Sequence, residues 1–399
     1  MRWAASAAVS ADLVPLADRV LGDVVRGLGG ERPDLAFVFF GPDHAPRVAA
    51  LRERVRAALG PVPVVGASAL GVVGGGREHE GRTGLSVTAA RLPDVAVRLF
   101  HVTEDRLPSP DAPPSAWHAA LDVPATPTPG FVLVADPYSV RADTLVGGLD
   151  FAWPGARKVG GLASGAAGPG DTVLLVGDRV VSGGAVGVAL AGDVVLAPAV
   201  AQGCRPFGPT MTITACREHL LLTLDGQPAL DAVQRVLREG TERDRALARS
   251  SALFLGVETD PFAVPTDDGG PWLVRNFLGR ERDGGGLFVG ERLRVGRRVR
   301  MHLRDRATSA EDLEKTLDAC ASTLPAPCAG ALVFSCLGRG MHLYGVPDHD
   351  ARAFHARFPG VPLGGFFCSG EIGPVGSSTH LHGFTSSFGL FLPKTTRDA

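Results

Sequence analysis

Residues 37–71, with the sequence FVFFGPDHAPRVAALRERVRAALGPVPVVGASALG, contain a strand–helix–strand pattern that ends in a glycine turn. The apolar run 37–40 predicts a buried strand. Apolar residues then recur at the spacing of one helix face, at Val48, Leu51, Val55 and Leu59. A second apolar run at 62–65 leads into the turn Gly66-Ala-Ser-Ala-Leu-Gly71. Alternating strands and helices of this kind predict an α/β protein.

The same pattern occurs twice more along the chain. A second copy opens with the apolar run 131–134 and reaches the turn Gly160-Gly-Leu-Ala-Ser-Gly165, and the interval from Phe131 to Gly160 equals that from Phe37 to Gly66. A third copy runs from 331–334 through a helix at 351–358 to Gly365-Phe-Phe-Cys-Ser-Gly370. Apolar return strands start at Gly84 and Gly383, at equal intervals after the first turn glycine of copies one and three. We predict repeated strand–helix–strand units, with mixed sheets covered by helices.

The length of 399 residues predicts two or three domains. We place one boundary near Cys216, which gives a domain at 1–215 with two repeat units and a second domain at 216–399. Seven prolines between 107 and 130 predict a linker or surface loop around a short helix that contains Trp117. A fragmentary fourth unit is assigned to residues 252–255, 272–275 and 284–288.

Composition limits the partners of the protein. The chain is 45% hydrophobic and 21% charged, as expected of a packed core, and its net charge of −2 gives no global attraction to nucleic acid. Six arginines fall between 294 and 306, but Val299, Met301 and Leu303 alternate with the polar residues there. This alternation predicts a half-buried strand with a solvated face rather than a nucleic-acid surface.

Several other classes of protein and site are not expected. The longest apolar stretch, at 180–192, is too short to span a membrane, so we expect no membrane insertion. Six cysteines without a CxxC pair favour free thiols and a cytoplasmic protein. The chain contains no P-loop, no GxGxxG, no GxSxG and no HExxH, and we expect no cofactor. Possible zinc ligands without a recognised spacing do not lead us to expect a metal site; they are Cys336, Cys368, His380 and His382.

The third copy differs from the other two in its turn. Where copies one and two have Ala69 and Ala163, copy three has Cys368, and Glu371 follows it. Positions that the architecture requires recur in all copies, so a thiol beside a carboxylate is an addition. Cys368 is either a buried small residue, as most free cysteines are, or part of a site.

Polar residues follow both strands of the third copy. Ser335 and Arg339 come after the first strand and Ser369 after the second, where loops meet at the carboxyl edge of a sheet and ligands usually bind. Arg339 could bind a carboxylate and Glu371 an ammonium group, as in an amino acid. The alternative is an ion pair between these two side chains that only joins the loops.

A second class of function is a cysteine-dependent enzyme. Cys368 would be the nucleophile, and His382 or His380 would be the base that forms the thiolate.

The chain resembles the FIST family, whose N-terminal and C-terminal domains occur together in signal-transduction proteins. The resemblance rests on stretches between about residues 30 and 392: 34–40, 64–68, 74–78, 84–90, Arg275-Asn276, 285–287, Leu332-Val-Phe-Ser-Cys-Leu-Gly-Arg-Gly340, Gly370-Glu-Ile-Gly-Pro374 and 381–387.

The resemblance implies a sensory module that binds a small ligand, with amino acids as the suggested class, and no established catalytic reaction. It implies signalling through a separate output protein or a homo-oligomer, since the matching segments fill the chain. The ligand pocket would be lined by Arg339, Glu371, Ser335, Cys368, Ser369, Arg275 and His382. An interaction scaffold that binds no ligand is a third alternative.

Overall fold

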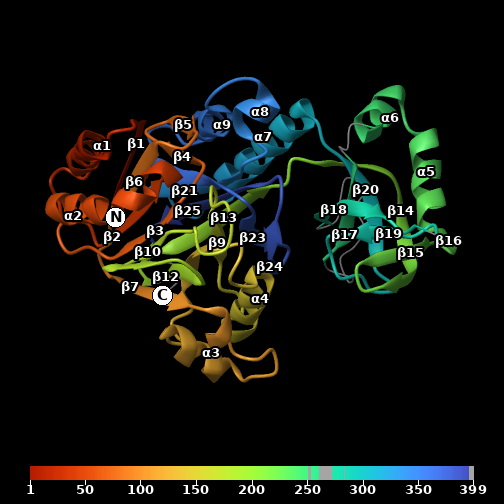
Figure 1. Ribbon diagram of the computed structural model, residues 1–399, viewed down its shortest axis with the longest axis horizontal. Coiled ribbons are helices and arrows are strands. Elements are labelled where there is room, and N and C mark those ends of the chain that lie inside the picture. Colours follow the sequence, from red (N-terminus) through yellow and green to blue (C-terminus); the bar gives the residue numbers. More distant parts are fainter. Residues whose placement is uncertain (250–252, 260–271, 283, 395–399) are drawn as a thin grey trace. The chain divides into compact units, whose positions relative to one another are not determined.

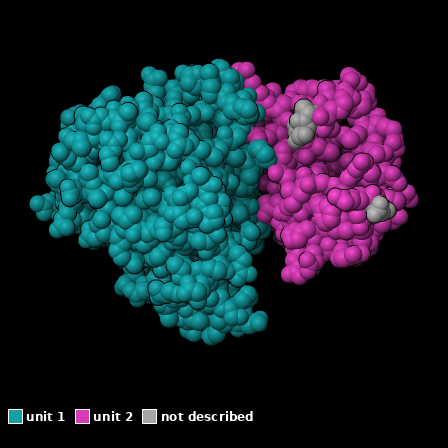
Figure 2. Space-filling view, in the orientation of Figure 1, with its two compact units in different colours: residues 1–200, 314–399 teal, residues 201–313 magenta. Residues whose placement is uncertain are grey.

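The computed structural model describes residues 1–249, 253–259, 272–282 and 284–394. Contacts divide the chain into two compact units, one of residues 1–200 with 314–399 and one of residues 201–313 (Figure 2). The predicted α/β class with mixed sheets and covering helices is confirmed.

The first unit consists of three copies of one order of elements: strand, helix, strand, helix, strand, hairpin and return strand (Figure 1). Copy one comprises β1 (Arg2–Val9), α1 (Leu13–Gly27), β2 (Leu35–Phe40), α2 (Val48–Leu59), β3 (Val64–Ser68), β4 (Gly71–Gly74), β5 (Arg77–Glu80) and β6 (Gly84–Arg91). Copy two comprises β7 (Val95–Val102), α3 (Pro114–Leu121), β8 (Gly130–Ala135), α4 (Ala142–Ala152), β9 (Lys158–Leu162), β10 (Leu174–Val176), β11 (Arg179–Val181) and β12 (Ala185–Gly192). Copy three comprises β13 (Val195–Ala201), α7 (Arg306–Thr323), β21 (Gly330–Cys336), α8 (Gly340–Tyr344), α9 (His349–Arg357), β22 (Leu363–Cys368), β23 (Glu371–Val375), β24 (Ser378–His382) and β25 (Ser386–Leu392).

Each copy contributes its hairpin to the sheet of another copy. The three six-stranded sheets have the equivalent orders β1-β6-β2-β3-β10-β11, β7-β12-β8-β9-β23-β24 and β13-β25-β21-β22-β4-β5. In each sheet the two central strands of a copy are parallel, and the return strand and the exchanged hairpin pair antiparallel with them. The hairpins are therefore exchanged in a ring, so that every sheet depends on two copies.

The first glycine of each turn recurs because the parallel strands approach closely there. Each of these glycines faces a residue of the neighbouring central strand, in the pairs Val38 with Gly66, Leu133 with Gly160, and Val333 with Gly365. A Cβ on the glycine would lie 2.1, 2.0 and 1.9 Å, respectively, from the carbonyl oxygen of that partner. No side chain fits at these distances, so the architecture requires glycine.

Residues of β2 alternate between two cores. Phe37 and Phe39 face a core shared by all three copies, in which the Phe39 ring lies 4.5 Å from that of Phe366. Val38 and Phe40 face the opposite side, where α1 and α2 cover the sheet (Figure 1). The shared core joins the copies into one unit.

The second unit is an antiparallel sheet with two helices. It comprises β14 (Arg205–Arg217), β15 (Leu220–Leu224), β16 (Gln227–Pro228), α5 (Ala229–Glu239), α6 (Glu242–Arg249), β17 (Leu253–Glu258), β18 (Trp272–Arg280), β19 (Leu287–Val289) and β20 (Arg298–Leu303). The sheet closes on itself because β14 pairs with both β20 and β15.

The second unit corrects two expectations. The fourth repeat unit is wrong, because β17 pairs antiparallel with β18 instead of forming a parallel unit; residue 252 lies outside the described residues. The strand at β20 is confirmed, and Val299 and Met301 are buried. Its other face is not simply solvated, since His302 is buried beside the Trp272 ring and burial lowers its pKa to about 4.

The compact units follow boundaries other than the one near Cys216. The second unit, residues 201–313, is inserted in the third copy from the end of β13 to the first part of α7, and the residues on both sides of it belong to the first unit. The division into 1–215 and 216–399 stays a prediction. The segment 107–130 contains the expected short helix, α3, on which Trp117 is buried. Among the described residues, none of the helices is long and apolar enough to cross a membrane.

Candidate functional site

The candidate site lies where β21 and β22 end in the third copy. Arg339 follows β21 and is completely buried. Its guanidinium donates to both carboxylate oxygens of Asp350, from Nε at 3.0 Å and from Nη2 at 3.2 Å. Its Nη1 donates to the Phe384 carbonyl at 3.4 Å, and its Cζ lies 5.5 Å from the centre of the Tyr344 ring. The planar fork is thus satisfied by a bidentate ion pair within the protein.

Asp350, in the first turn of α9, is the acceptor at the centre of this network. Besides Arg339, it accepts hydrogen bonds from Ser335 Oγ at 3.1 Å, from Ser386 Oγ and from His349 Nδ1 at 3.0 Å. Burial alone would raise the pKa of Asp350, but the Arg339 charge and the donated hydrogen bonds outweigh it and hold this pKa below its usual range. Asp350 is therefore ionised at neutral pH.

Glu371 and Cys368 form a second, mainly neutral part of the site. Cys368 Sγ lies 3.4 Å from Glu371 Oε1, and Glu371 Oε2 accepts the backbone N–H of Thr385 at 3.0 Å. Burial raises the pKa of Glu371 to about 8, and burial together with the Glu371 charge raises the pKa of the Cys368 thiol. At neutral pH this environment favours a protonated carboxyl and a thiol, whereas a nucleophilic cysteine needs a lowered pKa.

The other expected site residues are more dispersed. His382 lies opposite Glu371 on β24, and its Nε2 lies 3.0 Å from the Gly373 carbonyl oxygen. Ser369 is exposed, and its backbone N–H donates to the Leu162 carbonyl at 3.1 Å. Arg275 belongs to the second unit, where its Nε donates to Glu291 at 2.8 Å. The structure thus brings together Ser335, Arg339, Cys368 and Glu371, with His382 on the adjoining strand.

Asp350 is not among the site residues predicted from the sequence, although the repeat carries a signal for it. Asp350 precedes Gly365 by the same interval at which Leu51 precedes Gly66 and Leu145 precedes Gly160. Both leucines are buried on the core face of their helices. An aspartate at this position of the third copy therefore needs a buried partner, which Arg339 supplies.

Four members of the network, Asp350, Glu371, Cys368 and Ser335, replace an apolar or small residue of the other copies. Strand register and distance from the turn glycine give the equivalent residues of copies one and two: Leu51 and Leu145 for Asp350, Val72 and Leu174 for Glu371, Ala69 and Ala163 for Cys368, and Phe40 and Ala135 for Ser335. All of these equivalents are buried. A buried ion pair is seldom more stable than apolar packing of the same volume, so the fold itself does not require this network.

The fold and this network define a three-copy α/β protein with one specialised copy. Residues 34–227 match the FIST N domain and residues 229–374 match the FIST C domain. The chain belongs to the FIST family, as its resemblance predicted, and FIST domains are associated with signal transduction.

Relatives occur in bacteria and a plant. Uncharacterized protein MT0656 of Mycobacterium tuberculosis (strain CDC 1551 / Oshkosh) is 34% identical over 92% of this chain and 93% of its own. Uncharacterized protein Mb0898c of Mycobacterium bovis is 33% identical over 98% of this chain and 99% of its own. The F-box/LRR-repeat protein At5g63520 of Arabidopsis thaliana is 27% identical over 42% of this chain and 32% of its own.

Among solved structures, a cyanuric acid hydrolase from A. caulinodans matches 99% of this chain and 100% of its own. Its TM-score of 0.31 and identity of 11% are too low to support an argument.

Proposed function

We propose that this protein is a cytoplasmic signal-transduction protein that binds a small polar ligand, such as an amino acid, at the buried network of the third copy. The observation that supports it is the replacement of core residues by Asp350, Glu371 and Cys368 in one copy of three, with Arg339 as the buried partner of Asp350. The output passes to a separate protein or through a homo-oligomer.

The chemistry of the network suits a zwitterion. A ligand carboxylate would compete with Asp350 for the guanidinium of Arg339, which is the strongest donor of the site. A ligand ammonium group beside Glu371 would favour the ionised carboxylate, which burial otherwise disfavours. Ser335 and Ser369 would line the site, and Arg275 is not included because it pairs with Glu291 in the second unit.

Ligand binding of this kind would give the network two states, one with Asp350 paired with Arg339 and one with the ligand carboxylate in its place. Because Asp350 is held by four side chains, its displacement from Arg339 would release Ser335, Ser386 and His349 together. A ligand shifts such an equilibrium only by its difference in affinity for the two states.

A thermal-shift screen of the amino acids on the wild type and on Glu371→Gln tests the proposal. Gln preserves the shape of the protonated side chain but cannot become anionic, so the variant should fold and lose amino-acid binding. A ligand at 100 times its Kd stabilises the native state by roughly 2.7 kcal/mol. The matched control is Glu239→Gln on the exposed end of α5. No hit on the wild type, or equal hits on all three proteins, would contradict the proposal.

The cysteine-dependent enzyme is not favoured by the geometry. The raised pKa of Cys368 and its complete burial oppose formation of a thiolate.

A further inference from the structure

Each copy of the first unit has one helix beside the hairpin that another copy supplies. These helix–hairpin junctions join α4 to β23–β24, α9 to β4–β5, and α2 to β10–β11. Because the three junctions occupy equivalent places in the repeat, a junction whose helix–hairpin contacts differ from those of the other two indicates a function specific to that junction.

The junction at α4 is closed by a carboxylate. Asp150 accepts two hydrogen bonds from Thr379 on β24, one from the backbone N–H at 2.6 Å and one from the side-chain hydroxyl at 2.8 Å. The same carboxylate pairs with Lys158 Nζ at 2.8 Å, and this lysine is completely buried. One side chain of the helix thus fastens the hairpin.

The junction at α9 is closed by carboxyl side chains from both sides. Glu78 of β5 accepts the backbone N–H of Ala351 in the first turn of α9 at 2.7 Å. Asp348 accepts the backbone N–H of Glu78 at 2.8 Å. This second junction is again closed by carboxyl groups of the protein itself.

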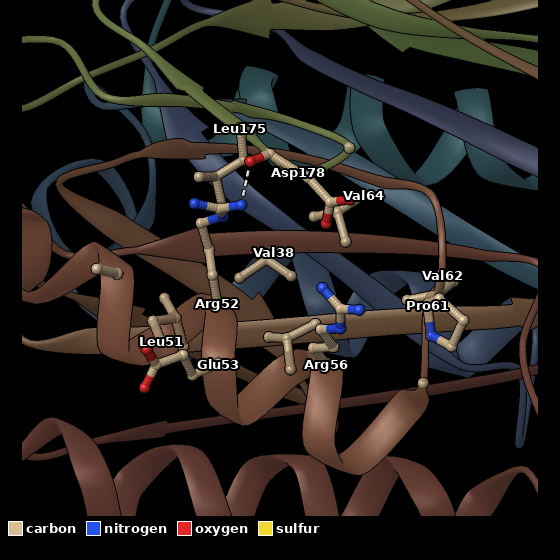
Figure 3. Close-up of a pocket in the computed structure, with 14 residues that line it drawn as sticks. Val38, Leu51, Arg52, Glu53, Arg56, Pro61, Val62, Val64, Leu175 and Asp178 are labelled. Carbon is tan, nitrogen blue, oxygen red and sulfur yellow. Dashed lines mark hydrogen bonds between the residues drawn. The ribbon is translucent and has the colours of Figure 1, made fainter.

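The junction at α2 is open and contains a cavity of about 270 Å³ (Figure 3). Arg56 precedes Gly66 by the same interval at which Asp150 precedes Gly160, so an arginine replaces the fastening aspartate. The strands of the β10–β11 hairpin are three residues long, against five in β23–β24. Because the β10–β11 hairpin is shorter and α2 carries an arginine instead of the aspartate, the space between helix and hairpin is not filled.

The lining of this cavity combines an apolar floor with two guanidinium groups. Val38, Val64 and Leu175 form the floor from three neighbouring strands and are buried. Arg52 and Arg56 project from one face of α2 (Figure 3). Arg52 donates to the Asp178 carbonyl, and the exposed guanidinium of Arg56 makes no hydrogen bond or ion pair with any residue that the structure describes.

The charges select the class of ligand. A carboxylate matches the planar fork of an arginine, and the floor suits a short branched hydrocarbon chain. Glu53 and Asp178 also line the cavity, so a second negative charge on the ligand would be repelled. The cavity is smaller than those that hold drug-sized ligands, which restricts it to small metabolites.

We propose that this cavity binds a small organic monocarboxylate. The carboxylate binds Arg56 and Arg52, and the hydrocarbon part lies on Val38, Val64 and Leu175. The bound acid connects α2 to the β10–β11 hairpin, as Asp150 and Glu78 connect the other two junctions.

Isothermal titration of the full chain with 3-methylbutanoate tests this inference. The acid should bind, while 3-methylbutanamide, which has the same shape without the charge, should bind at least about tenfold more weakly. Arg56→Gln should weaken acid binding by about the same factor.

Two variants serve as controls. Arg54→Gln removes the same charge from the same helix, but Arg54 pairs with Asp18 at 3.1 Å and does not line the cavity, so binding should not change. Glu371→Gln should also leave acid binding unchanged, which separates this site from the one proposed above. Equal affinity for the acid and the amide, equal binding by Arg56→Gln, or no binding at about 20 mM acid would overturn the inference.

Discussion

Replacement of Glu371 by glutamine should change how the stability of the first unit depends on pH. In the folded protein, burial raises the pKa of Glu371 to about 8, from an ordinary value of 4.5. Between these two values the unfolded chain has lost the proton and the folded chain still binds it. The unfolded state therefore binds fewer protons, and the free energy of unfolding decreases as the pH rises.

The size of the effect follows from the linkage relation. One group that is protonated only in the folded state changes the free energy of unfolding by about 1.4 kcal/mol per pH unit. Between pH 5 and pH 7 the wild type should lose roughly 2 to 3 kcal/mol through Glu371. Glu371→Gln has no ionisable group at this position, so its free energy of unfolding should not decrease by this amount. Glu78, whose pKa burial also raises to about 8, contributes equally to both proteins and cancels in the comparison.

Urea unfolding at pH 5 and pH 7, followed by tryptophan fluorescence, measures the difference. Three of the four tryptophans, Trp3, Trp117 and Trp153, belong to the first unit and report on it. At pH 5 the free energy of unfolding of the variant should be equal to or lower than that of the wild type. At pH 7 the difference in the free energy of unfolding should have shifted in favour of the variant. Equal pH dependence in the two proteins would refute the assignment of Glu371 as a neutral buried carboxyl.

Three further predictions concern the same unit. Cys368 should react with iodoacetamide far more slowly than an unfolded thiol, because burial raises its pKa, and mass spectrometry of the labelled chain would show rapid labelling if this is wrong. Asp350→Leu should cost about 3 to 5 kcal/mol by leaving the buried Arg339 without its carboxylate counter-charge, whereas the double change Arg339→Met/Asp350→Leu should recover most of it in urea unfolding. Gly160→Ala should cost about 3 kcal/mol because its Cβ would meet a carbonyl oxygen at 2.0 Å, while Gly147→Ala, with open space around it, should not destabilise; equal melting temperatures would contradict the reasoning.

The repeat units could be predicted from the sequence because their signals are local. The spacing from an apolar run to a glycine is a property of one short continuous segment, and Gly66 and Gly160 each face the carbonyl that explains their recurrence. The exchange of hairpins could not be predicted in this way. It pairs Gly74 with Gly364, and nothing in either segment specifies so distant a partner.

The candidate site was partly predictable for a similar reason. Comparison of the turns identified Cys368 and Glu371 as additions of the third copy, and loop position identified Arg339. Asp350 lies on a helix whose other residues fit an ordinary amphipathic pattern, so only alignment with Leu51 shows that it occupies a core position. The insertion of residues 201–313 also has no local signal, since its end falls inside the continuous helix α7.

The exchanged hairpins affect how the protein can fold as it is synthesised. The β4–β5 hairpin of the first copy joins a sheet whose central strands, β21 and β22, belong to the third copy. At ribosomal rates of about 5 to 20 residues per second, β22 emerges roughly 15 to 60 seconds after β4. During that interval the hairpin has no sheet to join, and its free strand edge can pair with another nascent chain. A truncated chain that ends before the third copy would keep this edge exposed permanently, so premature termination should yield aggregates rather than a smaller soluble protein.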